Sequence, residues 1–292
     1  MLVACGPTRA PTPTHAPSQI PTESPAPTPT AIPPSAPSPT IPPAEDTARP
    51  PDVSARVWYL GSNGWALQIG EKLLIFDYQE MSDPDPPASG EPRNLERGYI
   101  DVDELRTFDS YVFVTHSHQD HFDPVIFEWQ EQVEEITYFF GWKAGNNPEH
   151  HYLVGPRATT QAGDVEVYTI NSHHAGVPEV AFLVKVDGYT IYHNGDYRAE
   201  YVQDYEYLRT FTDHIDIAFV IGHPFVDHPY FQQAVRLNEV FHPTYMFAIN
   251  REGEEYKCRQ FAELLAEHGI EVNVISGERR GDSFACPRSS AE

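Results

Sequence analysis

The sequence predicts an α+β domain in which two β-sheets are sandwiched between layers of helices. Short apolar runs typical of strands follow one another from about residue 56, and in the second half of the chain they alternate with helical stretches. Strand-rich and strand-helix parts in one chain are typical of sheets that pack face to face and carry helices on their outer faces. The residues before 56 have a different composition and are expected to stay outside this fold.

The N-terminal segment is dominated by Pro, Thr, Ser and Ala, and most of the 28 prolines of the chain lie in it. Such a segment buries too little apolar surface to offset the entropy of ordering it, and its prolines favour extended polyproline II geometry. We therefore predict a disordered linker over residues 6–54, a folded domain over 55–286 and a tail over 287–292. A Pro-rich ligand for a recognition module is the alternative role of the linker.

The first residues, M-L-V-A-C-G, resemble the lipobox of bacterial lipoproteins, in which a cysteine becomes the lipidated N-terminus. Residues 1–5 lack the charged start and long apolar stretch of a signal peptide, so either the start codon lies upstream or the match is accidental. A lipobox that leads into a spacer predicts an exported lipoprotein, anchored to a membrane through Cys5 and located outside the cytoplasm. No other run approaches the roughly 20 apolar residues that a spanning helix needs.

The charge and the cysteines limit the partners. The chain has 19 basic and 43 acidic side chains, a formal net charge of −24 that repels phosphate backbones, so nucleic acid is not expected as a partner. Cys258 and Cys286 either pair in an oxidising compartment or are two unrelated thiols. Because their spacing is not that of a zinc ribbon, a metal site has to depend on the histidines.

The first half of the domain is rich in strand patterns. Apolar runs at 57–69 and 72–78, joined by a Gly-Glu turn, predict a hairpin, and the short run at 111–114 predicts a buried strand. The Asp-Pro pair at 123–124 is typical of a helix start, and V-I-F-E-W-Q-E-Q-V-E-E-I follows it. Further strands are expected at 137–140, 165–170, 180–186 and 189–193.

The second half alternates more evenly. Helices are expected near 200–210, 230–240 and 254–268, between strands at 215–221, 245–249 and 270–275. The Pro-, Asp- and Gly-rich stretch at 82–97 predicts an exposed loop near the opening of any site.

The strand at 111–114 is followed at once by T-H-S-H-Q-D-H. In an extended backbone His116 and His118 project to the same side, while Asp120 and His121 can turn towards a second point. Neutral imidazole and carboxylate are ligands of Zn²⁺. This spacing therefore predicts a metal site at the end of the strand, whereas ordinary surface histidines would not require it.

T-H-S-H-Q-D-H resembles the H-x-H-x-D-H signature of the metallo-β-lactamase superfamily, whose members fold as a four-layer αββα sandwich and are mostly metal-dependent hydrolases. L-L-I-F-D-Y, with Asp77, resembles the early strand of that family that ends in an aspartate beside the metal site. I-Y-H-N-G-D, with Asp196, resembles the strand whose Gly-Asp carboxylate bridges two metals. The resemblance covers the chain from about residue 56 to 276.

The resemblance also implies the ligand sets. The first metal would be held by His116, His118 and either His173 or His174, and the second by Asp120, His121 and Asp196. The family expects one more histidine after a late strand, where Asn250 stands in this chain, and an amide oxygen is a poorer zinc ligand than imidazole. His223 is the candidate substitute, and an ordinary loop histidine is the alternative for it.

The implied chemistry is hydrolysis by a metal-bound hydroxide. The resemblance implies one or two Zn²⁺ ions, with Mn²⁺ or Fe²⁺ as alternatives. Asp120 would orient the water or move its proton. The G-D-Y-R and G-S-N-G-W neighbourhoods resemble the lactonase-like and phosphodiesterase-like branch. The expected substrate is therefore an ester, lactone or phosphodiester in a small molecule or lipid. A different class of function stays open, because Asn250 favours a surface-tethered metal- or ligand-binding protein with a degraded site.

Overall fold

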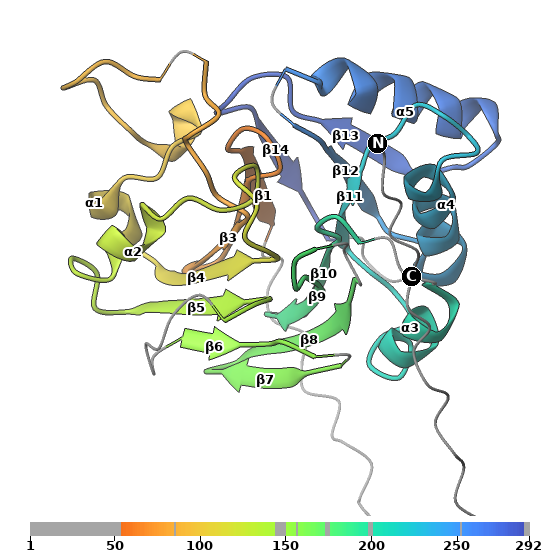
Figure 1. Cartoon of the computed structure of the whole chain (residues 1–292), viewed down its shortest axis with the longest axis horizontal. Helices are drawn as coiled ribbons and strands as arrows, with labels where there is room; N and C mark the ends of the chain where they lie inside the picture. The colour runs from red at the N-terminus through yellow and green to blue at the C-terminus, as the bar shows by residue number, and fades with distance from the viewer. Residues whose placement is uncertain are drawn as a thin grey trace, which may run out of the picture. The chain divides into compact units, whose positions relative to one another are not determined.

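The computed structural model describes residues 54–84, 86–143, 150–155, 157–172, 176–197, 201–251 and 253–288. Almost all of the predicted linker, the residues before it and the last four residues of the chain lie outside the described ranges, and so do Cys5, His173 and His174. The described part forms two seven-stranded sheets, which confirms the predicted α+β sandwich (Figure 1).

The first sheet has the strand order β14-β1-β2-β3-β4-β5-β6. Its strands β1 to β3 form an antiparallel meander, β3 to β6 are parallel, and β14 pairs antiparallel with β1. The strands are β1 (Ala55–Tyr59), β2 (Trp65–Ile69), β3 (Lys72–Phe76), β4 (Asp109–Val114), β5 (Ile136–Phe140), β6 (His150–Tyr152) and β14 (Ser283–Cys286). Its short helical turns are η1 (Leu95–Arg97), α1 (Val102–Leu105) and α2 (Ile126–Trp129).

The second sheet has the order β13-β12-β11-β10-β9-β8-β7, with antiparallel pairing from β7 to β10 and parallel pairing from β10 to β13. Its strands are β7 (Thr159–Ala162), β8 (Val165–Asn171), β9 (Val180–Val186), β10 (Tyr189–His193), β11 (Ile217–Ile221), β12 (Tyr245–Ile249) and β13 (Asn273–Ser276). The helices are α3 (Tyr201–Leu208), α4 (Pro229–Phe241) and α5 (Glu255–Glu267). The longest of them, α4 and α5, have 13 residues each, and no described helix is long and apolar enough to cross a membrane.

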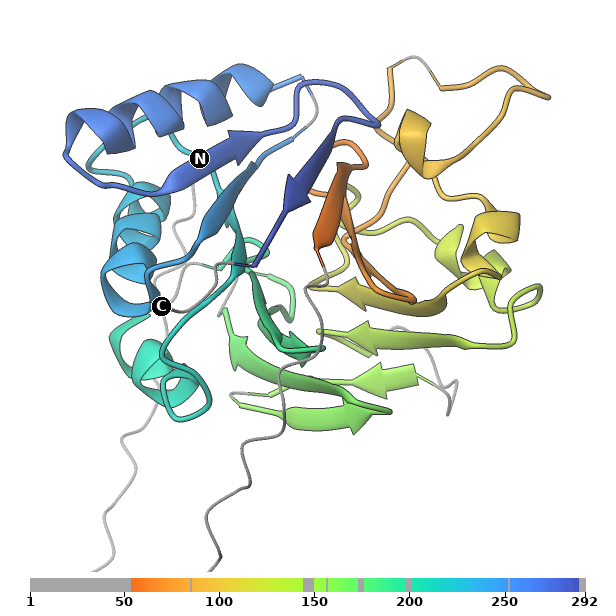
Figure 2. The same ribbon diagram turned by 180° about the vertical axis from the view of Figure 1, so that it is seen from behind.

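Three apolar cores hold four layers together (Figures 1 and 2). The central core lies between the sheets, where the Trp65 ring packs against Phe219 and Phe247 at centroid distances of 5.6 and 5.0 Å. A second core joins one sheet to α3, α4 and α5, and a third joins the other sheet to α1 and α2. Strands such as β11, which is buried along its whole length, therefore have apolar residues on both faces.

The structure differs from the sequence predictions where local signals are weak. The run at 57–69 is divided into β1 and β2 by a turn in which Gly61 and Ser62 have positive φ. The helix expected after residue 123 is a single turn, α2. Strands β6, β7 and β14 were not predicted, because they are only three or four residues long, and β6 and β7 are largely polar.

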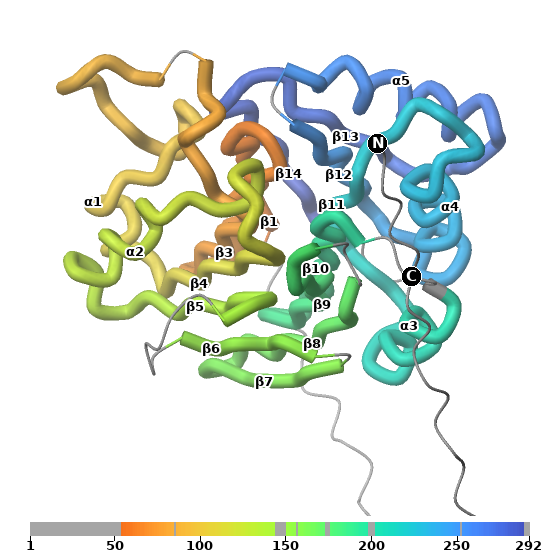
Figure 3. The backbone as a smooth tube through the Cα atoms, viewed as in Figure 1, coloured from red at the N-terminus to blue at the C-terminus, as the bar shows by residue number. Residues whose placement is uncertain are grey.

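The parallel strands place the site. The carboxyl ends of neighbouring parallel strands meet at one edge of a sheet, and ligand sites of open α/β sheets lie there. The T-H-S-H-Q-D-H loop follows β4 of one sheet, and the G-D turn follows β10 of the other, so the two sheets bring these segments together. Figure 3 shows the backbone of the loop after β4 next to the end of β10.

Candidate metal centre

The side chains of His116, His118 and Asp196 converge, with one potential ligand atom of each within 4.8 Å of the others. Nε2 of His116 lies 2.9 Å from Nδ1 of His118 and 4.0 Å from Oδ2 of Asp196. Two nitrogens bound tetrahedrally to zinc are roughly 3.3 Å apart, given Zn–N distances of about 2.0 Å. The donor types and their spacing therefore fit a divalent cation after a movement of a few tenths of an ångström.

His116 is held from behind. The residue is fully buried, and its Nδ1 lies 3.1 Å from the Thr115 hydroxyl and 3.3 Å from Oε1 of Glu179. These contacts fix the ring so that Nε2 faces the cluster. Burial and the neighbouring His121 ring lower the pKa of His116 to about 2, which keeps the imidazole in the neutral form that binds metals.

Glu179 is a site residue that the sequence reasoning missed. This buried carboxylate precedes β9, accepts a hydrogen bond from the Ser172 hydroxyl at 2.6 Å, and also accepts one from the backbone N–H of Asp196. Gly195 leaves room for it, since a Cβ there would lie 2.6 Å from Oε1 of Glu179. Glu179 therefore positions a candidate ligand from each sheet, and its only sequence signal is an acid directly before an apolar strand.

Asp77 holds the base of the H-x-H-x-D-H loop, at the end of β3 where its φ is 45°. Its carboxylate accepts hydrogen bonds from the Thr115 N–H at 2.7 Å and the Thr115 hydroxyl at 2.8 Å, and it contacts Nδ1 of His121 at 2.7 Å. Burial alone would raise the pKa of Asp77, but the charge of His121 and His193 holds it below its usual value. This aspartate therefore orients His121, as carboxylates behind metal-binding histidines do.

His121 lies beside the cluster, and burial opposes its protonation. The carboxylates of Asp77 and Asp196 outweigh that effect and raise the pKa of His121 well above its usual value. Its Nε2 lies 2.9 Å from the side-chain amide nitrogen of Asn63 and 3.4 Å from Oδ1 of Asp196. The side chain predicted to serve a second metal thus lies in contact with a protein amide.

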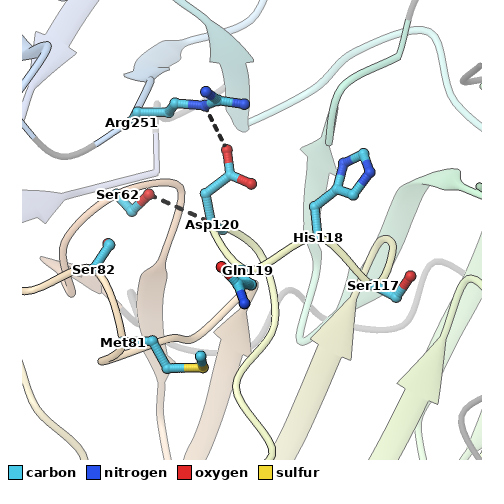
Figure 4. A pocket seen from close by; sticks show the side chains of 8 residues that line it. All are labelled: Ser62, Met81, Ser82, Ser117, His118, Gln119, Asp120 and Arg251. Carbon is cyan, nitrogen blue, oxygen red and sulfur yellow. Dashed lines mark hydrogen bonds and ion pairs between the residues drawn. The ribbon is translucent and has the colours of Figure 1, made fainter.

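Asp120 belongs to the predicted second set, and Asn250 stands where the resemblance expects a further histidine. Both have protein partners. Oδ2 of Asp120 accepts a hydrogen bond from Nε of Arg251 at 2.9 Å, and the Asp120 charge raises the pKa of Arg251 (Figure 4). The Asn250 amide donates to the Gly222 carbonyl at 2.9 Å and accepts from the Arg251 N–H at 2.8 Å. Asn250, at the position where the resemblance expects a histidine, therefore fixes the backbone that carries Arg251.

Two hollows meet at the Asp120–Arg251 pair. The larger one, of about 620 Å³, is shown in Figure 4. It is lined by Ser62, Met81, Ser82, Ser117, His118, Gln119, Asp120 and Arg251. The smaller one, of about 260 Å³, reaches Asp196 and His223. Of the predicted 82–97 loop, Ser82 borders the larger hollow.

The structure brings most of the predicted ligands to one place. His116, His118 and Asp196 form the cluster, and Asp120 and His121 adjoin it, with Nε2 of His121 4.0 Å from Oδ2 of Asp120. His223 borders the smaller hollow and stacks on His228 at a centroid distance of 3.4 Å, so its metal role stays a prediction.

Three residues outside the predicted ligand set are also buried or almost buried. Cys258 and Cys286 are buried and unpaired, which agrees with the alternative of two unrelated thiols. Arg280 is almost buried and donates to the backbone carbonyls of Leu60 and Gln79. It therefore holds the turn that carries Asn63 rather than meeting a substrate.

Comparison with known proteins agrees with this fold. No curated protein sequence matches the chain significantly. Among solved structures, Igni18, a metallo hydrolase from the archaeon Ignicoccus hospitalis, is 14% identical, with a TM-score of 0.55 over 80% of this chain and 98% of its own. An isothiocyanate hydrolase from Delia radicum gut bacteria is 17% identical, with a TM-score of 0.51 over 80% of this chain and 100% of its own.

The diiron β-hydroxylase CmlA from Streptomyces venezuelae is 13% identical, with a TM-score of 0.54 over 82% of this chain and 55% of its own. At these identities the solved structures show a shared fold. The family model described as "Beta-lactamase superfamily domain" matches residues 56–243, which include β1 to α4 and all of the H-x-H-x-D-H loop. The chain therefore belongs to the beta-lactamase superfamily.

Proposed function

We propose that the protein is a metal-dependent hydrolase whose metal ion is held by His116, His118 and Asp196. The observation that carries this proposal is the convergence of two imidazoles and one carboxylate within 4.8 Å, with His118 on the wall of a hollow of about 620 Å³. His173 or His174, which lie outside the described residues, is the further ligand that the family resemblance implies. Zn²⁺ is the proposed ion, and Mn²⁺ and Fe²⁺ are the alternatives.

A divalent cation held by these residues would supply an acidic water, with a pKa of about 7, and would polarise the bond under attack. The chain's own part is to position groups and move a proton. Asp120, with 17% of its side chain exposed at the edge of the hollow, is the proposed proton acceptor. Its backbone carbonyl accepts hydrogen bonds from Ser62 at 3.3 Å and Asn63 at 3.2 Å, so the carboxylate is placed by a fixed loop.

The proposed substrate is a small molecule or lipid that contains an ester, lactone or phosphodiester. The larger hollow has the size of small-molecule sites, which are roughly 300 to 1,000 Å³. Met81 gives its wall an apolar patch, while Gln119 offers an amide that can donate a hydrogen bond to an ester or phosphate oxygen.

The rival function is a metal- or ligand-binding protein with a degraded site, and the engagement of Asn250 with the backbone favours it. One experiment separates the two functions. The purified chain is analysed for metal and assayed with a p-nitrophenyl ester, a lactone and bis(p-nitrophenyl) phosphate. Bound metal with turnover that disappears in His116→Ala supports the hydrolase. Bound metal without turnover of any of these compounds supports the binding role, and a chain that takes up no metal contradicts the hydrolase and leaves ligand binding as the rival role.

We also propose a lipid anchor at Cys5, which would keep the domain at a membrane surface outside the cytoplasm. The support is the lipobox resemblance followed by the Pro/Thr spacer. In cells that express the gene with its upstream codons, the protein is expected in the membrane fraction, and Cys5→Ser is expected to release it.

A further inference from the structure

Of the second set of predicted ligands, Asp196 belongs to the cluster with His116 and His118, and the other two residues contact protein groups. Asp120 is paired with the guanidinium of Arg251, and Nε2 of His121 meets the amide of Asn63, while Asn250, at the position of the expected histidine, is bound to the backbone. A second cation would have to displace the first two of these partners, and the amide that stands in place of the expected histidine would add little binding in return. The donor set therefore does not fit a second ion in the way that His116, His118 and Asp196 fit a first.

Arg251 lies where that second charge would be. It is the second residue after β12, and the Asn250 hydrogen bonds hold the backbone before it. Asp120 and Arg251 border both hollows, so the guanidinium stands beside the metal cluster and not on a remote surface. Figure 4 shows its side chain extended over the hollow towards Asp120.

The guanidinium is suited to this role because it stays protonated and presents several donors in a fixed plane. Only Nε is used by Asp120, and the terminal Nη1 and Nη2 groups donate to no described residue. They remain available for an oxygen of a bound substrate. A cation that faces developing negative charge on the reacting group is the part that a second metal ion plays in two-metal sites.

The ion pair between Asp120 and Arg251 is poorly placed to stabilise the fold. The Arg251 side chain is 69% exposed, and exposed ion pairs contribute only about 0 to 1 kcal/mol to stability. Its position beside the proposed proton acceptor is therefore better explained by the chemistry of the site.

We infer that Arg251 takes the place of a second metal ion: the chain binds one divalent cation, and the Arg251 guanidinium supplies the second positive charge to Asp120 and to the substrate. This inference rests on the proposed metal-dependent function, and it names the number of ions and a further substrate-facing residue.

The test is metal stoichiometry, measured on the full chain by native mass spectrometry and by titration of the metal-free protein with Zn²⁺ against a chelator. The wild-type protein is expected to take up one equivalent. The double variant Asn250→His, Arg251→Ala removes the guanidinium and supplies the missing imidazole, so it is expected to take up a second equivalent. Arg259→Ala is the matched control, because Arg259 is a half-exposed arginine paired with Glu278 at 3.2 Å on the nearby helix α5; it is expected to stay at one equivalent.

Each result decides between the proposals. Two equivalents in the wild type, or one equivalent in the double variant, overturn the role of Arg251 and leave the proposed hydrolase intact. No bound ion in the wild type overturns the proposed function and the inference with it. Circular dichroism spectra that match the wild type show that a variant is folded, and Arg251→Ala alone gives a second measurement, with an expected loss of kcat of about 100-fold.

Discussion

The two candidate ligand groups lie side by side at the same strand ends, and they differ in what surrounds them. In the first group, Glu179 and Thr115 hold His116 from behind, so that its ligand atom converges on those of His118 and Asp196. In the second group, Asp120 contacts Arg251 and His121 contacts Asn63, through the atoms that would otherwise face a metal. A ligand motif therefore identifies the residue types of a site, but the neighbouring side chains decide which of them hold an ion.

The largest expected effect comes from the first group. His116→Ala removes the central ligand, so we expect the bound metal to be lost and turnover to fall by about 10³-fold or more. Metal content per chain and kcat are the measurements. His268→Ala, a change at an exposed histidine after α5, is the control and should keep both. Full metal content in the His116 variant would contradict the assigned cluster.

Glu179 offers a milder way to weaken the same group. Glu179→Gln keeps the size of the side chain but removes the charge that faces Nδ1 of His116, and loss of such a supporting carboxylate weakens metal binding by roughly 10- to 100-fold. Competition with a chelator measures this affinity. Glu166→Gln, on the neighbouring strand β8, removes an acid that bonds only the Tyr168 hydroxyl among the described residues and should leave affinity unchanged. Equal affinities for the two variants would show that Glu179 does not support the ligand.

The sequence predicted His116 and His118 as ligands of one metal and assigned Asp196 to the second, whereas the structure groups all three side chains. Physical reasons explain why the sequence locates these residues. The strands β3, β4 and β10 are largely apolar and buried, so short apolar runs in the sequence show where they lie. Their ends carry Asp77, the H-x-H-x-D-H loop and Asp196, and parallel strands bring such ends to one edge of a sheet.

The partners in the second group could not be predicted in the same way. Arg251 meets Asp120 across 131 positions of sequence, and Asn63 meets His121 across 58, because the fold places β12 and the turn before β2 beside the H-x-H-x-D-H loop. A local pattern contains no information about such a contact. The short strands β6, β7 and β14 escaped prediction for a related reason, since pairing at the end of a sheet does not require a long apolar run.

The buried His193 beside Asp77 predicts that the stability of the fold depends on pH. Burial lowers the pKa of His193, which lies 3.7 Å from Asp77, to about 4, so the unfolded chain binds more protons than the folded one below its ordinary pKa of 6.5. The low pKa of Asp77 acts in the same direction at lower pH. Stability of the metal-free protein should therefore fall with pH, by roughly 2 kcal/mol between pH 6.5 and 5 from His193.

Urea unfolding of the metal-free protein at these pH values measures this loss. His193→Phe keeps a flat ring against Phe76 and removes the titrating group, so the variant should lose less stability than the wild type over the same interval. An unchanged slope would show that His193 is not the buried group responsible.

The smallest expected effect is on the free energy of unfolding, and it tests whether Arg251 in the second group serves the site or the fold. Arg251→Ala removes an ion pair whose arginine is 69% exposed, so the free energy of unfolding should change by less than about 1 kcal/mol although turnover falls. Arg280→Ala is the contrasting variant, because its side chain is 8% exposed and lies 3.6 Å from Asp83; removing such a buried charge leaves its partners unpaired and should cost about 3 kcal/mol or more. Denaturant unfolding of both variants gives the comparison. A large stability loss in Arg251→Ala would mean that this arginine serves the fold, and that the contrast between the two ligand groups lies in packing rather than in chemistry.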